Sequence, residues 1–143
     1  MKRLLATLLS SDLKSPGYNF GILIFRIAVA AQLIIVHGLK KIGVGVAAPE
    51  AVPNPLGLPP ALNEFIAIAA NTYLPFLLII GFCTRLAALP AVCVTLTGYF
   101  IVHANDSLAV SDVPYMYSVS LLLIIILGGG RYSLDHYISQ KIK

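Results

Sequence analysis

Four long runs of apolar residues constrain this chain more than any other feature of its sequence. A helix that crosses a bilayer needs about 20 predominantly apolar residues. The first three runs meet that length. The fourth is shorter, but it carries Tyr115 and Tyr117, whose rings suit the headgroup layer at the end of a span. We therefore expect membrane-spanning helices at residues 20–37, 61–82, 86–103 and 114–128.

The composition indicates an integral membrane protein and argues against a water-soluble one. Hydrophobic residues make up 58% of the 143 residues and charged residues only 11%, whereas soluble domains carry about 25% charged residues. The net charge of +4 does not indicate nucleic-acid binding, because the basic residues gather at the chain ends and beside the apolar runs. The length predicts a single membrane domain over residues 1–143.

The connections between the runs predict an all-α fold, a bundle of four transmembrane helices. Residues 44–60 contain five prolines and form a loop, whereas residues 83–85 form a tight turn. A short helix is expected at residues 3–14, lying on the membrane surface. The distribution of lysine and arginine predicts that both termini are cytoplasmic, in a multi-pass protein of the bacterial inner membrane. The inside would then hold Lys2, Arg3, Lys14, Arg85, Arg131, Lys141 and Lys143, against Lys40 and Lys41 outside.

Arg26 is the most unusual residue of the apolar runs. An arginine near the bilayer centre costs about 2.5–3.5 kcal/mol on insertion scales, so such residues turn inward and find partners. Two interpretations stay open. The side chain either reaches toward the headgroups or forms a structural ion pair, or it binds a ligand. On an ideal helix His37 lies within about 20° of Arg26, which predicts that the two share a face.

Polar side chains in the second and third runs extend this pattern. Thr95, Tyr99 and His103 recur every four residues, and Asn71 stands near the middle of its run. Convergent polar groups between apolar walls are typical of a pocket for the head group of a lipid-soluble molecule. The predicted ligand-binding residues are Arg26, His37, Asn71, Tyr99 and His103, and those predicted at the pocket mouth are Lys41, Asp106 and Asp112.

The sequence carries no motif for a metal, haem or flavin. Two histidines and an aspartate could bind a metal, but no tight spacing such as HExxH supports one. Cys83 and Cys93 match no CxxC pattern, which leaves them as small buried hydrophobic residues. We therefore predict no metal site and no internal electron carrier.

Four stretches of the chain, in order, resemble the DoxX family of small four-helix membrane proteins. They are FRIAVAAQLIIVHGLKK, GFCTRLAALPAV, YFIVHAND and GGGRYSLD. The resemblance implies membrane redox work, since one branch of the family looks like a subunit of thiosulfate:quinone oxidoreductase and other members join complexes linked to oxidative stress. Family members often carry a glutamate where this chain has Asn71. This difference removes the obvious carboxylate partner for Arg26 and favours a hydrogen-bonding role for Asn71.

Together these observations favour a quinone-associated membrane subunit of a bacterial redox system, with a partner protein supplying or removing electrons. The alternative, from another class, is a non-catalytic membrane scaffold whose proline-rich loop recruits a partner. Membrane lipid is an expected contact of either. Small residues such as Ala67, Ala69 and Ala70 could also support a homo-oligomer.

Overall fold

The computed structural model describes residues 15–142, and the surface helix expected at residues 3–14 lies outside this range. All regular elements of the described residues are helical. They are α2 (Pro16–Gln32), η1 (Leu33–Gly38), α3 (Leu39–Lys41), α4 (Pro60–Ile68), η2 (Ala69–Tyr73), α5 (Leu74–Ile80), α6 (Thr84–Thr97), η3 (Gly98–Val102), α7 (Leu108–Leu127) and α8 (Leu134–Ile142). The three η elements are π-helical turns built into longer helices.

These elements combine into four helices long and apolar enough to cross a membrane, as the apolar runs predict. They are Pro16–Lys41, Pro60–Ile80, Thr84–Val102 and Leu108–Leu127. The last begins at Leu108, ahead of the start predicted at residue 114, because Pro114 lies inside the helix and does not begin it. Pro16 and Pro60 each occupy a first helical position, where the missing N–H has no intrahelical acceptor to lose.

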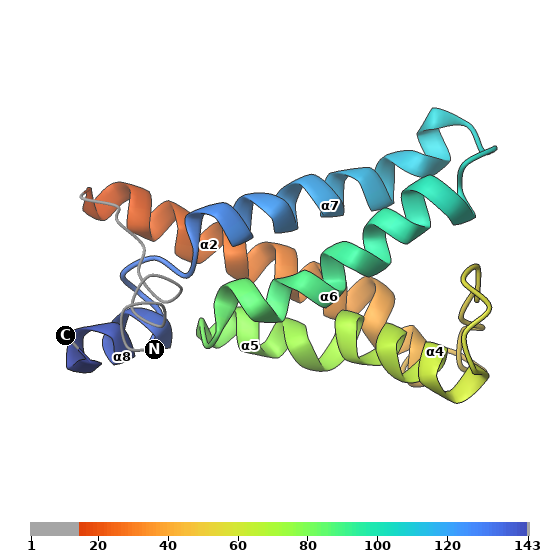
Figure 1. Ribbon diagram of the computed structural model, residues 1–143, viewed down its shortest axis with the longest axis horizontal. Coiled ribbons are helices and arrows are strands. Elements are labelled where there is room, and N and C mark those ends of the chain that lie inside the picture. The colour runs from red at the N-terminus through yellow and green to blue at the C-terminus, as the bar shows by residue number, and fades with distance from the viewer. Residues whose placement is uncertain (1–14, 143) are drawn as a thin grey trace.

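The bundle has two different ends (Figure 1). One end, here called the α8 end, holds Pro16, the turn at 81–83 and α8. The opposite end, here called the loop end, holds the connections at 42–59 and 103–107. α6 packs along α7, and α5 packs against both α2 and α6. The first span begins at the α8 end and the last span ends there. The distribution of lysine and arginine predicts that this end is cytoplasmic.

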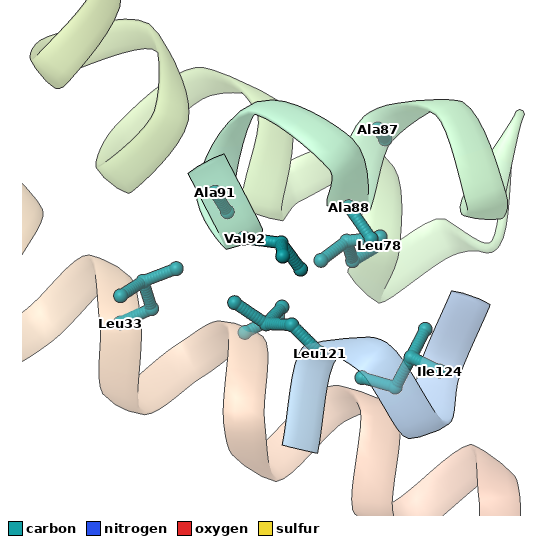
Figure 2. Close-up of a cluster of buried hydrophobic side chains, with 9 residues drawn as sticks. Leu33, Leu78, Ala87, Ala88, Ala91, Val92, Leu121 and Ile124 are labelled. Carbon is teal, nitrogen blue, oxygen red and sulfur yellow. The ribbon is translucent and has the colours of Figure 1, made fainter. Parts of the chain in front are cut away.

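The core between the spans is small and is built largely from alanine. Ala87, Ala88 and Ala91 of α6 are buried, and their size lets the neighbouring helices approach closely. Figure 2 shows Leu78 of α5 and Val92 of α6 pointing toward Leu121 of α7. Large apolar side chains elsewhere face outward, as expected of a lipid-facing surface.

Of the three alanines considered for a homo-oligomer, two are used inside the chain. Ala67 and Ala70 are buried within the bundle, whereas Ala69 is half-buried. A contact between two copies of the chain would therefore have to use residues other than Ala67 and Ala70.

Arg26 of α2 is fully buried at the α8 end, where it links the end of α5 to the segment after α7. Its Nη1 donates to the Gly129 carbonyl at 2.8 Å. Its Nη2 donates to the carbonyls of Tyr132 at 3.1 Å and Ile79 at 3.4 Å. Carbonyls at helix ends have no intrahelical donor, and the guanidinium carries five N–H groups in a fixed fork. Arg26 thus joins α2 to the end of α5 and to the segment after α7.

Asp135 completes this cluster from the first turn of α8. Its two carboxylate oxygens accept hydrogen bonds from the backbone N–H groups of Cys83 at 2.6 Å and Thr84 at 2.8 Å. The carboxylate therefore caps the N-terminus of α6, where the helix dipole favours a negative charge. Asp135 is also the electrostatic partner of Arg26. We call Arg26, Gly81, Thr84, Gly129 and Asp135 the α8 clasp.

Two glycines make room for the clasp. Gly81 has φ +71°, and a Cβ there would collide with the Arg26 guanidinium and with Ser133. A Cβ at Gly129 would lie 2.8 Å from both Ser133 and the Thr84 hydroxyl. Nearby, the Arg85 Nε donates to the Ile125 carbonyl at 2.8 Å near the end of α7. The stretches GFCTR and GGGRYSLD are thus explained by helix-end packing.

We predict that Arg26→Met destabilises the protein strongly. The change leaves the buried Gly129 carbonyl and the partly buried Ile79 and Tyr132 carbonyls without this donor, and Asp135 without its cation. Breaking a buried charged network costs about 3–5 kcal/mol. The measurement is thermal unfolding in mild detergent, followed by size-exclusion chromatography. Arg131→Met is the matched control, because that side chain is exposed and its backbone N–H makes the bond to Asn19. Equal melting of Arg26→Met and the native chain would contradict the role of the clasp.

A second prediction concerns Cys83, which lies between two spans. Burial raises the pKa of the Cys83 thiol, and the Asp135 carboxylate raises this pKa further. Less thiolate is then present at a given pH, so alkylation by iodoacetamide should reach half its maximal rate at a higher pH than for a free cysteine. In Asp135→Asn this midpoint should move to lower pH. Rates are measured by mass spectrometry in a Cys93→Ser background, and an unmoved midpoint would count against the contact.

Candidate functional site

A cavity of about 590 Å³ opens in the loop-end half of the bundle, and we call it the loop-end cavity. This volume lies within the range of about 300–1,000 Å³ typical of ligand pockets. All four spans and the proline-rich loop contribute to its walls. The lining comprises Leu33, His37, Lys41, Glu50, Val52, Pro53, Pro55, Leu56, Leu58, Asn63, Ile66, Ala67, Asn71, Cys93, Val94, Thr95, Thr97, Gly98, Val102, His103, Val110, Val113, Pro114 and Tyr117.

Each of the first three spans contains a π-helical turn beside this cavity. η1 carries His37, η2 carries Asn71, and η3 carries Gly98 and Val102 in the lining. π-turns are rare within helices and occur frequently at functional sites, because an inserted residue changes which side chains face inward. Three such turns around one cavity are the strongest structural sign of a site in this chain.

The distance along the first span explains why Arg26 and His37 do not share a site. Arg26 and Leu33 are buried and His37 lines the cavity, so all three face the interior of the bundle. Eleven α-helical residues would separate the two by about 16 Å along the axis. Arg26 lies in the clasp at the α8 end and is absent from the cavity lining.

His37 and Asn71 both contribute polar side chains to the cavity wall. The His37 ring packs edge-on against Tyr117, with 5.3 Å between ring centroids. Asn71 is only 4% exposed, and its Nδ2 donates to the Ala67 carbonyl in its own helix at 2.9 Å. Because an amide carries two N–H groups and a carbonyl, one bond leaves Asn71 capacity for a ligand.

Gly38 sets the distance between the helices that carry these two side chains. A Cβ on Gly38 would collide with the Asn71 carbonyl and would lie 2.7 Å from the Thr72 hydroxyl. The backbones of η1 and η2 therefore approach as closely as only glycine allows. The sequence pair His37–Gly38 thus combines a polar side chain with the close approach that brings it near Asn71.

Charged residues stand at the outer part of the cavity. Lys41 Nζ donates to the His37 carbonyl at 3.3 Å and lies 4.0 Å from the Glu50 carboxylate. His103 lines the cavity, and its Nδ1 is 2.7 Å from Asp106 Oδ2. Among the described residues, no three histidine, cysteine or acidic side chains gather in a way that could hold a metal ion.

The structure therefore brings together some of the predicted site residues and separates others. His37, Asn71, His103 and Lys41 line the loop-end cavity. Tyr99 lies outside the lining and packs against Phe100 and Tyr115, with ring centroids 4.9 and 5.4 Å away. Asp106 reaches the cavity only through His103, and Asp112 is exposed and outside the lining.

Sequence reasoning missed Tyr117, Glu50 and the loop residues of the lining. Tyr117 was expected at the headgroup layer, whereas the structure places it in the cavity lining against His37. Residues 52–58 offer no periodic pattern, so their inward position depends on how the loop folds back.

We predict that Gly38→Ala destabilises the protein and disturbs the cavity. The new methyl group meets the Asn71 backbone, which cannot swing away, and overpacking of this kind costs about 1–3 kcal/mol. Gly21→Ala is the matched control on the same span, because a Cβ there meets nothing within 4 Å. The control should melt at or above the native temperature, since alanine is the better helix former. Equal melting of both variants would show that η1 and η2 are not in tight contact.

Comparisons with known proteins agree with this architecture. The sequence model of the DoxX family matches residues 21–104, which include His37, Asn71 and His103. An uncharacterized protein of Haemophilus influenzae (strain ATCC 51907 / DSM 11121 / KW20 / Rd) is 36% identical over 96 residues. The aligned region covers 64% of this chain and 64% of that relative. No solved structure matches the chain. Because the family model matches more than half of the residues, the chain belongs to the DoxX family of membrane proteins.

Proposed function

We propose that the chain is a quinone-associated membrane subunit of a bacterial redox system and binds the quinone head group in the loop-end cavity. The observation that carries this proposal is a cavity of about 590 Å³ with apolar walls, into which π-turns of two spans bring His37 and Asn71. Ligand sites typically combine apolar walls with a few placed polar groups. The proposal locates the complex in the bacterial inner membrane.

The donor set of the cavity fits a molecule with ring carbonyls. The Asn71 amide, the His37 imidazole and the Tyr117 hydroxyl can each donate a hydrogen bond. When bound, a quinone would supply two-electron, two-proton chemistry. In this proposal Asn71 and Tyr117 orient the ring, and a ring nitrogen of His37 holds or releases a proton. Lys41 contributes positive charge near the same wall, where it donates to the His37 carbonyl.

Arg26 has a positioning role in this proposal and does not bind the ligand. Its donors are directed to the carbonyls of Gly129, Tyr132 and Ile79 at the α8 end. The sequence has no motif for an electron carrier. The proposal therefore includes a partner protein that supplies or removes the electrons.

The position of the proline-rich loop supports ligand binding over a pure scaffold. Val52, Pro53 and Leu56 face the cavity. The Glu50 backbone N–H also donates to the Lys40 carbonyl at 3.0 Å, which ties the loop to the end of the first span. A loop that served only to recruit a partner would have no need to line a cavity between the spans.

The experiment measures quinone in protein purified in mild detergent, by chromatography of the lipid extract. We expect roughly stoichiometric quinone with the native chain. His37→Gln and Asn71→Leu should each lower the bound amount about tenfold, because a lost buried hydrogen bond costs on the order of 1–3 kcal/mol. His136→Gln is the matched control, since this histidine lies in α8, away from the cavity.

Two results would contradict the proposal. One is native protein with no more quinone than the surrounding detergent-solubilised lipid. The other is quinone that persists unchanged in folded His37→Gln and Asn71→Leu. Either result would favour the scaffold, and the next step would be to identify the proteins that co-purify.

A further inference from the structure

We infer that the loop-end cavity opens sideways into the membrane between α4 and α6, past Cys93, and that its ligand is an amphiphile whose apolar tail leaves by this opening. The inference rests on the proposed function and deepens it, because it specifies a long-tailed molecule that arrives through the lipid. The inference thus favours this molecule over a water-soluble one that enters from the loop end.

Cys93 is the central observation, because it both lines the cavity and is exposed at the surface of its helix. It stands five residues after the fully buried Ala88, so it lies roughly 140° around α6 from that core-facing position. Thr97, one turn later, also lines the cavity and is half-buried. The cavity therefore continues from the core onto the outer side of α6.

The depth of this opening matches the hydrocarbon layer of a membrane. Cys93 stands halfway along the 19-residue span Thr84–Val102, and Asn71 is near the middle of the 21-residue span Pro60–Ile80. A span of this length is about as long as the hydrocarbon layer is thick, roughly 30 Å. The opening thus faces lipid tails, at a depth similar to the polar wall of the cavity.

The cavity lining contributed by α4 and α6 carries no charged side chain. Ile66, Ala67, Cys93 and Val94 are apolar, and the polar groups are those of Asn63, Thr95 and Thr97. The imidazole of His37 and the buried amide of Asn71 come from π-turns of the first two spans. An uncharged, partly aliphatic wall opposite these groups suits a molecule with a polar ring and an apolar tail.

The proline-rich loop at the loop end is held by several hydrogen bonds. Asn63 of α4 donates from Nδ2 to the Pro53 carbonyl at 3.1 Å. Within the loop, Asn54 Nδ2 donates to the Leu58 carbonyl at 2.6 Å and Asn54 Oδ1 accepts from the Leu58 N–H at 2.9 Å. Entry between α4 and α6 leaves all these bonds in place.

The test compares two ligands that share one ring, decyl-ubiquinone and the same dimethoxy-methyl-benzoquinone without the decyl chain. Cys93→Trp fills the opening with an exposed bulky side chain. Leu86→Trp is the matched control, because Leu86 is exposed on α6 but lies outside the cavity lining. We expect Cys93→Trp to bind decyl-ubiquinone at least about tenfold more weakly while the tail-less ring binds within about twofold of native. Leu86→Trp should bind both as the native chain does.

The second readout is the protection of the native Cys93 thiol from alkylation. It does not depend on how a tryptophan variant folds. Decyl-ubiquinone should slow alkylation of Cys93 by N-ethylmaleimide at least about tenfold, measured by mass spectrometry. A cysteine introduced by Leu86→Cys should react at the same rate with and without the quinone. Equal rates at Cys93 with bound quinone would overturn the sideways opening.

The outcomes separate the two proposals. If the native chain binds neither quinone, the proposed function fails and this inference fails with it. If the native chain binds both quinones, but Cys93→Trp changes neither affinity and Cys93 is not protected, only the sideways opening is wrong.

Discussion

The buried guanidinium of Arg26 is the interaction on which the rest of the bundle depends. An arginine inside a membrane span is tolerated when its charge is balanced and its guanidinium finds acceptors. Here the two Nη groups donate to the backbone carbonyls of Ile79, Gly129 and Tyr132, the buried Nε has no acceptor among the described residues, and the countercharge is Asp135. Because these groups come from three separate parts of the chain, satisfying Arg26 fixes how α2, α5 and the segment before α8 meet.

The clasp closes one end of the bundle, and the other end is arranged differently. At the α8 end, glycines and short turns bring helix ends into direct contact. At the loop end, three π-turns alter the packing, and the space between the spans is shared by a folded-back loop and a cavity. The spans therefore contain two groups of polar residues, one at the α8 clasp and one at the loop-end cavity. Those of the clasp satisfy helix ends, and those of the loop end face the cavity.

The sequence predicted the parts of this structure that follow from the cost of placing groups in lipid. Four apolar runs correspond to four spans, and Arg26 is turned inward as its charge requires. The partners of Arg26 were not predictable from residue types, because they are carbonyls, one of them 103 residues away in the chain. A backbone acceptor leaves no mark in the sequence beyond the glycines that make room for it.

Part of the candidate site was also predictable from the cost of placing polar groups in lipid. Polarity alone indicated His37, Asn71 and His103, and all three line the cavity. Arg26 does not join them, because about 16 Å of helix separates it from His37, and the Tyr99 ring packs against Phe100 and Tyr115 outside the cavity lining. In the sequence, Asn71 indicates the loss of a carboxylate partner for Arg26. In the structure Asn71 lines the cavity, and the carboxylate that acts on Arg26 is Asp135 of α8.

The most direct test of this division is an experimental structure of the protein in lipid nanodiscs that contain quinone. The account predicts density for a ring beside His37 and Asn71, density for a tail between α4 and α6, and a guanidinium of Arg26 bonded to the carbonyls of the clasp. A ring bound against Arg26 at the α8 end, or a cavity filled only by side chains, would contradict it.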